Sequence, residues 1–249
     1  MKNVLYFVTA VVSFLVFSAK AGAEDCDVAN LDLMSFPAWE RENGYWVGEY
    51  TLMGADGNPL ASPNWNYPYD HYAGFIALQV KGNSITQRNV FLYPPQSEAV
   101  CVTNAAVLGA GECGVNGNEK IFSAAQSATD CSGGLSGPFF QYGMQLDTET
   151  RLIGDDTVLY QVRLNGDLTQ NQLTSLPGNG TRVRTAQGLY AGNPTYASFY
   201  RERKVSREEF FALLDAKRIE YNILAADHCG FDNGNQPSGV TCEEHFSMD

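Results

Sequence analysis

Candidates for acid–base chemistry are few in this sequence, because it contains only three histidines, His71, His228 and His245. His71 follows Asp70 in a segment crowded with aromatic residues, so these two side chains could act as acid and base toward a bound molecule. The alternative is a solvated loop histidine with no catalytic role. Neither a Gly-x-Ser-x-Gly nucleophile elbow nor a phosphate-binding loop occurs in the chain.

Residue types that bind metal ions gather in the C-terminal tail, which contains Asp227, His228, Asp232, Glu243, Glu244 and His245. Their spacing matches neither a zinc motif nor an EF-hand calcium loop, so we predict no metal site. Residues 109–114 fit the Gly-x-Gly-x-x-Gly pattern, but no strand precedes them and they include a cysteine. A dinucleotide site is therefore not expected, and no cofactor is predicted.

A polar run within an otherwise apolar strand could anchor a ligand. Residues 86–89 read Thr-Gln-Arg-Asn, which puts polar side chains on both faces of the predicted strand 84–92. Either Arg88 or the pair Gln87 and Asn89 should therefore point inward. Such a group would bind a carboxylate, phenol or carbonyl.

The element that organises the chain is the predicted strand 44–53. If Trp46 points inward, the period of two brings in Tyr50 and Leu52 and leaves Glu49 in water. Further strands are predicted at 72–80, 84–92, 119–124, 138–147, 157–166, 168–176, 181–190 and 195–204, separated by Gly- and Asn-rich turns. This spacing predicts an all-β fold, an antiparallel up-and-down barrel.

One helix is predicted after the last strand. Ser206 and Glu209 form a capping box, and Phe210, Leu214 and Tyr221 recur at helical spacing toward residue 227. Its apolar face should lie on the barrel. The predicted organisation is a signal peptide (1–23), an N-terminal arm (24–43), a barrel with its helix (44–227) and a stapled tail (228–249).

Six cysteines follow the predicted cleavage point, and an even number in an exported chain indicates disulfides that pin the loops. Closeness in sequence suggests Cys101 with Cys113 and Cys229 with Cys242. That pairing leaves Cys26 to join Cys131, although other pairings remain open.

The order of elements resembles the lipocalins and the wider calycin group: a helical arm, Gly44-Tyr45-Trp46 opening the first strand, a run of antiparallel strands and a final helix. The resemblance implies that Trp46 lies at the closed barrel end and that Arg201 or Arg203 packs across it. The chain departs from the family pattern in its long insertion at 93–137, its cysteines and the lack of a clear middle motif.

The net charge and the first residues limit which partners and which cellular compartment the sequence predicts. Residues 1–23 have the layout of a cleavable secretory signal, which predicts a secreted or periplasmic protein. Their removal takes away Lys2 and Lys20 and no acid, so the net charge changes from −12 to −14. Such a surface repels nucleic acid and anionic membranes, and no later segment predicts stable membrane insertion.

Taking the apolar half of each strand as the inner face predicts an aromatic lining with few polar groups. The residues expected to bind a ligand are Tyr50, Arg88, Tyr142, Met144, Tyr160, Gln187 and Phe199. The first hypothesis is a barrel that binds a small, largely apolar or aromatic molecule. The alternatives are a barrel enzyme, such as an isomerase, cyclase or lyase, and a structural or interaction protein whose barrel is filled. Oligomeric state is not indicated.

Overall fold

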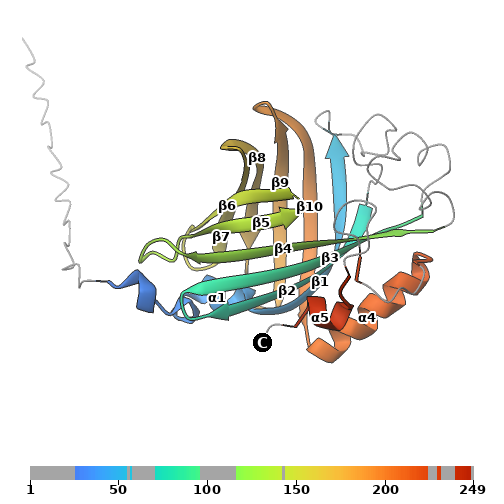
Figure 1. The fold of residues 1–249 in the computed structure, drawn as a ribbon, viewed down its shortest axis with the longest axis horizontal. Coiled ribbons are helices and arrows are strands. Elements are labelled where there is room, and N and C mark those ends of the chain that lie inside the picture. The colour runs from blue at the N-terminus through green and yellow to red at the C-terminus, as the bar shows by residue number, and fades with distance from the viewer. Residues whose placement is uncertain are drawn as a thin grey trace, which may run out of the picture.

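The computed structural model describes residues 26–54, 57, 71–95, 116–141, 144–223, 229–230 and 239–247. Its strands close into one antiparallel up-and-down barrel, in which each strand pairs with its neighbours in sequence and the last pairs with the first (Figure 1). The strands are β1 (Gly44–Gly54), β2 (His71–Lys81), β3 (Ser84–Tyr93), β4 (Asn118–Ala128), β5 (Leu135–Gln141), β6 (Met144–Leu152), β7 (Thr157–Leu164), β8 (Asp167–Ser175), β9 (Thr181–Tyr190) and β10 (Asn193–Val205). The predicted fold class is confirmed.

One predicted strand, 138–147, is two strands in the structure. β5 and β6 pair antiparallel with Gln141 opposite Met144. The polar and apolar residues alternate through this stretch, so the sequence reads as one continuous strand. The single glycine at 143 was too weak a turn signal to divide it.

The N-terminal arm closes one end of the barrel. It consists of η1 (Val28–Asn30), η2 (Leu33–Ser35) and α1 (Pro37–Glu42). Leu33, Trp39 and Arg41 donate hydrogen bonds of 2.9, 3.0 and 3.0 Å to carbonyls of the β2–β3, β4–β5 and β8–β9 connections. The predicted disulfide between Cys26 and Cys131 forms and ties the arm to the β4–β5 connection.

The C-terminal helix α4 (Arg207–Glu220) packs on the outer face of β1 and β2 (Figure 1). The Ser206 hydroxyl accepts a hydrogen bond of 3.1 Å from the Glu209 backbone, as the capping residues predict. Phe210 and Leu214 are fully buried there. The helix ends before the predicted residue 227, because Asn222 adopts a left-handed conformation with φ of 52°.

A second short helix, α5 (Cys242–His245), lies beside α4. The predicted disulfide forms and links Cys242, the first residue of α5, to Cys229. His245 is buried there, and its Nε2 lies 3.1 Å from the carbonyl of Asn89. Burial lowers the pKa of His245 to about 4. The imidazole is therefore neutral at pH 7, and the ring nitrogen donates to that carbonyl. The other predicted pair, Cys101 and Cys113, lies outside the described residues.

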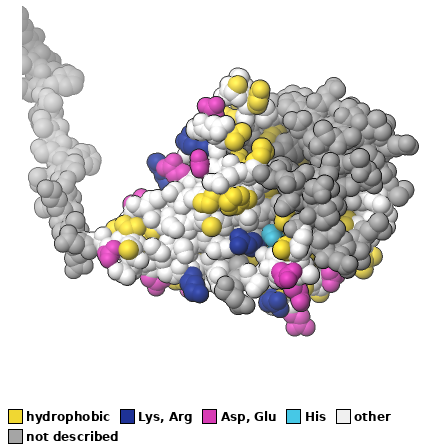
Figure 2. All heavy atoms as spheres, in the orientation of Figure 1, with side chains coloured by type: hydrophobic (Ala, Val, Ile, Leu, Met, Phe, Trp, Pro, Cys, Tyr) yellow, Lys and Arg dark blue, Asp and Glu magenta, His cyan; other side chains and the backbone are white. Residues whose placement is uncertain are grey.

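Acidic and basic side chains are interspersed on the face shown in Figure 2, so the negative net charge does not form one large patch there. Among the described residues, no helix has the length and hydropathy needed to cross a membrane.

Replacing Phe210 with alanine tests the contact between α4 and the barrel. We expect the free energy of unfolding to fall by about 3 to 5 kcal/mol, because the substitution leaves a cavity between the helix and the sheet. Urea denaturation measures this change. Ile219→Ala on the same helix is the matched control, since Ile219 is 81% exposed, and it should change stability by less than about 0.5 kcal/mol.

His245 should make stability depend on pH. Because the pKa of His245 is about 4 in the folded protein and about 6.5 when unfolded, the unfolded chain takes up the proton first. The contribution of neutral His245 to the free energy of unfolding is therefore complete above pH 6.5. About 3 kcal/mol of it is lost as the pH falls toward 4. In His245→Gln, the free energy of unfolding measured by urea titration should decline less steeply between pH 6.5 and 5. An unchanged slope in that variant would contradict the assignment, and the exposed His71→Gln provides the control.

Candidate ligand-binding cavity

A buried cluster of charged side chains forms the floor of the barrel interior. Glu202 of β10 accepts hydrogen bonds from Arg182 Nε (2.6 Å), Arg184 Nε (2.8 Å) and Arg184 Nη2 (2.7 Å), both from β9. Glu42, at the end of α1, pairs with the other edge of the Arg182 guanidinium. The antiparallel register places Arg182 directly opposite Glu202, so strand pairing itself brings these charges together.

The two guanidinium groups keep Glu202 ionised. Burial acts to raise the pKa of this carboxyl, but the charges of Arg182 and Arg184 outweigh that effect and lower it to about 2. Glu202 in turn holds the pKa of Arg184 above its ordinary value despite burial. The ionised Glu202 and Arg184 therefore form the centre of the floor, and Arg182 and Glu42 extend it toward α1.

Two glycines make room for this floor. A Cβ on Gly48 would lie 2.5 Å from Cγ of Glu202, and a Cβ on Gly74 would lie 2.2 Å from the Tyr50 ring. Neither distance leaves space for a side chain. Tyr50 fills the space over Gly74. Its hydroxyl donates a hydrogen bond to Glu202 (2.6 Å) and accepts one from Nη2 of Arg184 (2.8 Å).

Trp46 is buried at the closed end, below the charged floor, and its Nε1 donates to a carbonyl of α1 at 2.8 Å. The guanidinium that lies over its ring belongs to Arg182, 4.5 Å from the ring centroid, and Lys204 Nζ lies at 5.6 Å. The prediction of Arg201 or Arg203 in this position is wrong. Both are exposed on the outer face of β10, because odd-numbered residues of that strand point outward.

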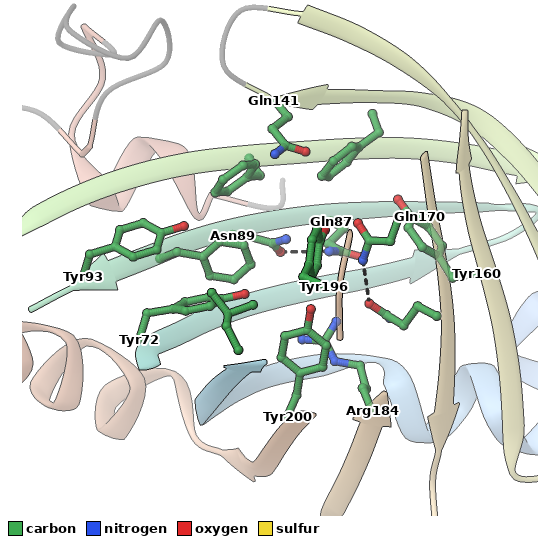
Figure 3. Close-up of a pocket in the computed structure, with 15 residues that line it drawn as sticks. Tyr72, Gln87, Asn89, Tyr93, Gln141, Tyr160, Gln170, Arg184, Tyr196 and Tyr200 are labelled. Atoms are coloured by element: carbon green, nitrogen blue, oxygen red, sulfur yellow. Dashed lines mark hydrogen bonds between the residues drawn. The ribbon is translucent and has the colours of Figure 1, made fainter. Parts of the chain in front are cut away.

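Above the floor, inward side chains leave a cavity of about 100 Å³ (Figure 3). A water needs about 10 to 15 Å³ of such space, so the cavity exceeds one water several-fold. Aromatic rings and amides share the lining, which comprises Leu52, Tyr72, Gln87, Asn89, Phe91, Tyr93, Phe122, Phe139, Gln141, Tyr160, Gln170, Gln172, Arg184, Tyr196 and Tyr200. The lining is aromatic as predicted, but it is far more polar than predicted.

Much of the hydrogen-bonding capacity of this lining is not used by the protein. Gln87 donates to Asn89 (2.9 Å) and Gln170 to Gln172 (3.5 Å), which leaves the Nδ2 of Asn89 and the Oε1 atoms of Gln87 and Gln170 without partners among the described residues. The Tyr160 hydroxyl is buried and likewise makes no hydrogen bond of normal geometry within the described part of the chain. Its polar neighbour is the Thr148 hydroxyl, which already accepts from Gln126 and donates to the Gly137 carbonyl. A buried polar group in this state usually indicates a function or a bound molecule.

Of the residues expected to bind a ligand, Tyr160 lines the cavity, and Tyr50 lies beneath it in the floor. Arg88 does not line it. Gln87 and Asn89 point inward, so Arg88 lies on the outer face, where it is half-buried, donates to the Gln87 carbonyl at 3.3 Å and has its pKa lowered by burial.

Three other predicted lining residues point outward or lie at the surface. Met144 and Phe199 are 47% and 46% exposed, and Gln187 is also exposed. The rule that the apolar half of a strand faces inward failed on β9 and β10, because the inward halves of these strands carry the charged floor. Tyr142 lies outside the described residues.

Among the described residues, the candidate catalytic and metal-binding side chains do not assemble; Asp227, His228 and Asp232 lie outside that part of the chain. His71 is exposed at the start of β2 and is not part of the cavity lining, and Asp70 lies outside the described residues. In the tail, Glu243 and Glu244 are exposed while His245 is buried against β3. Glu119 approaches Cys229 and Cys242, but these cysteines are oxidised to a disulfide and offer no thiolate.

The cavity residues that sequence reasoning missed had a visible pattern. Gln170, Gln172 and Thr174 alternate along β8, and Arg182 and Arg184 alternate along β9. Period-two polarity was present in both strands. Such a pattern by itself is typical of a solvated face, because a buried polar stripe requires partners that one strand does not reveal.

Comparison with known proteins identifies no family. No family model and no curated protein matches the chain. Solved structures that share part of the fold include a protein of unknown function from the DUF3598 family of Nostoc punctiforme, at 15% identity and a TM-score of 0.40 over 67% of this chain. This chain spans about half, 49%, of that protein.

Two other solved structures are similar at the same level. Zebrafish ileal bile acid-binding protein, complexed with cholic acid, matches at 12% identity and a TM-score of 0.36, over 66% of this chain and 99% of its own. An S-type phycobiliprotein lyase from Guillardia theta matches at 10% identity and 0.29, over 68% and 90%. At these TM-scores the matches assign no function.

Removing the Tyr160 hydroxyl tests whether it is unpartnered in the free protein. Tyr160→Phe should leave the free energy of unfolding unchanged or raise it by up to about 1 kcal/mol, because no hydrogen bond is lost. Tyr50→Phe is the contrasting variant and should cost about 2 to 3 kcal/mol, since it removes hydrogen bonds to two buried charged groups. Urea denaturation of both variants decides the matter. If Tyr160→Phe lowers the free energy of unfolding as much as Tyr50→Phe does, the Tyr160 hydroxyl has a hydrogen-bond partner in the free protein.

Proposed function

We propose that this protein binds one small aromatic molecule, bearing hydrogen-bonding groups, inside its barrel. The observation that carries the proposal is the set of unused polar atoms around the cavity, above all the buried Tyr160 hydroxyl. Aromatic rings of Tyr72, Phe91 and Tyr200 offer flat apolar surfaces beside these atoms. Such a combination of apolar wall and oriented polar groups is typical of small-molecule sites.

A filled barrel explains these residues less well. A core that only has to be packed uses apolar side chains or pairs its polar ones, because a buried polar group without a partner costs about 1 to 3 kcal/mol. This protein pairs buried polar side chains elsewhere in the same barrel. Gln126 donates hydrogen bonds to both Thr148 (2.7 Å) and Thr150 (2.8 Å). The unused atoms of Gln87, Asn89, Gln170 and Tyr160, by contrast, line the cavity.

Binding is also favoured over catalysis by the chemistry of the lining. The described cavity residues include no histidine, cysteine or carboxylic acid. Burial raises the pKa of Tyr72, Tyr160 and Tyr200 above that of a free phenol, so these hydroxyls stay protonated at neutral pH. They can donate hydrogen bonds, but they are poor general bases near pH 7.

We further propose that the protein acts outside the cytoplasm. Two disulfides form among the described cysteines, and the described part of the chain has no free cysteine. Disulfides persist in oxidising compartments. This supports the export signal that residues 1–23 predict.

The direct test is native mass spectrometry of the oxidised protein purified from its own source, followed by extraction and identification of any bound molecule. In parallel, 2-naphthamide and 2-naphthol serve as neutral aromatic probes in a fluorescence titration. We expect a stoichiometry of one. Tyr160→Phe should weaken binding about threefold to tenfold, the value of one hydrogen bond.

Tyr190→Phe provides the matched control, because Tyr190 is 79% exposed on the β9–β10 turn and loses the same hydroxyl. Its affinity for both probes should equal that of the wild type. A protein that carries no molecule from its source and shows no response to either probe would instead support the filled barrel.

A further inference from the structure

Arg184 is the one charged side chain among the described residues that line the cavity. An arginine that faces a cavity can anchor a ligand carboxylate through two parallel N–H groups. The structure shows that this paired face is already used. Nε and Nη2 of Arg184 both contact Glu202, at 2.8 and 2.7 Å, and Nη2 also donates to the Tyr50 hydroxyl.

The charge of the floor is likewise already balanced. Arg182 and Arg184 face Glu42 and Glu202, and all four side chains are at most 9% exposed. Lys120 is also buried in the barrel, but it lies on β4 and is not part of the described lining. A ligand carboxylate would therefore bring an additional negative charge next to a desolvated cluster that already pairs its cations, and the described lining offers it no second cation.

The remaining polar groups suit a neutral ligand. Nη1 of Arg184 has no partner among the described residues and can donate to a carbonyl or hydroxyl oxygen. The amides of Asn89 and Gln170 offer a donor and an acceptor, respectively. Tyr200 lies beneath these groups with its ring 4.7 Å from the Arg184 guanidinium carbon, so the aromatic wall and the donor are adjacent (Figure 3).

We infer that Glu202 makes this cavity selective for neutral, hydrogen-bonding aromatic molecules and against carboxylates. The inference rests on the proposed binding function and adds the ligand class to it. Glu202 touches no ligand in this scheme. It acts through Arg184, by occupying the edge of the guanidinium that a carboxylate would need.

The test compares 2-naphthamide with 2-naphthoate, which have the same shape and differ in charge. Wild-type protein at pH 7 should bind the amide at least about tenfold more tightly, a difference of about 1.4 kcal/mol. Glu202→Gln frees the Arg184 guanidinium from its counter-charge, so 2-naphthoate should then bind at least as tightly as the amide. Equal or tighter binding of 2-naphthoate by the wild type would overturn the inference.

Glu42→Gln is the matched control. It removes one negative charge from the same buried cluster, but Glu42 contacts Arg182 and not Arg184. Its preference for the amide should remain. A reversal as large as that of Glu202→Gln would show that net charge alone, and not the occupied edge of Arg184, sets the preference, and would overturn the assigned role of Glu202.

A second measurement needs no variant and keeps the inference testable if Glu202→Gln fails to fold. Lowering the pH from 7 to 5 raises the protonated fraction of 2-naphthoate about a hundredfold, because its pKa is about 4 like that of other carboxylic acids, whereas His245 stays mostly neutral in the folded protein. Glu202 stays ionised in this range, because its pKa is about 2. Binding of 2-naphthoate should strengthen while that of 2-naphthamide stays constant, and a constant 2-naphthoate affinity would contradict selectivity. Absence of binding by both probes would instead count against the proposed function.

Discussion

The ion pairs between Glu202 and the two arginines of β9 are the interaction on which the barrel interior depends. A buried carboxylate survives in a protein only with charged or hydrogen-bonding partners, and here Arg182, Arg184 and Tyr50 supply them. These partners come from β9 and β1, the two strands that flank β10 where the barrel closes. Closure of the sheet between β1 and β10 and pairing of β9 with β10 are therefore required for the charges to be paired at all.

This cluster divides the barrel into two regions. Below it, Trp46 and the arm with α1 form a packed end, and Glu42 at the end of α1 connects the arm to the cluster. Above it, packing loosens and the cavity begins. Because the cluster must be fully paired to be tolerated, it is a rigid floor, and it fixes the position of Arg184, the one arginine among the described residues that line the cavity.

The outer face is organised independently of the inner one. Phe210 and Leu214 of α4, together with Phe246, cover apolar residues on the outside of β1 to β3 and form a second core. Strand β2 is thus buried on both faces, which is why it reads as an almost continuous apolar run. By contrast, β8 to β10 are exposed on their outer face, and side chains such as Val183 and Phe199 lie in water.

The sequence by itself determined the barrel class, most of the element order and the Ser206 cap, and it favoured Cys229 with Cys242, because each depends on local spacing, turn residues or closeness along the chain. Cys26 and Cys131 are 105 residues apart, so the sequence left their pairing open and the structure decided it. The sequence also narrowed the anchor on β3 to Arg88 or the Gln87 and Asn89 pair. Only the tertiary structure decided which alternative points inward, and that Arg184 rather than Val183 faces the cavity. The physical reason is that an inward charge is stable only with its partners, and Glu202 and Glu42 come from segments 18 and 140 residues away from the arginines they pair with. Periodicity along one strand reveals that two faces differ, but the partners on other strands decide which face is buried.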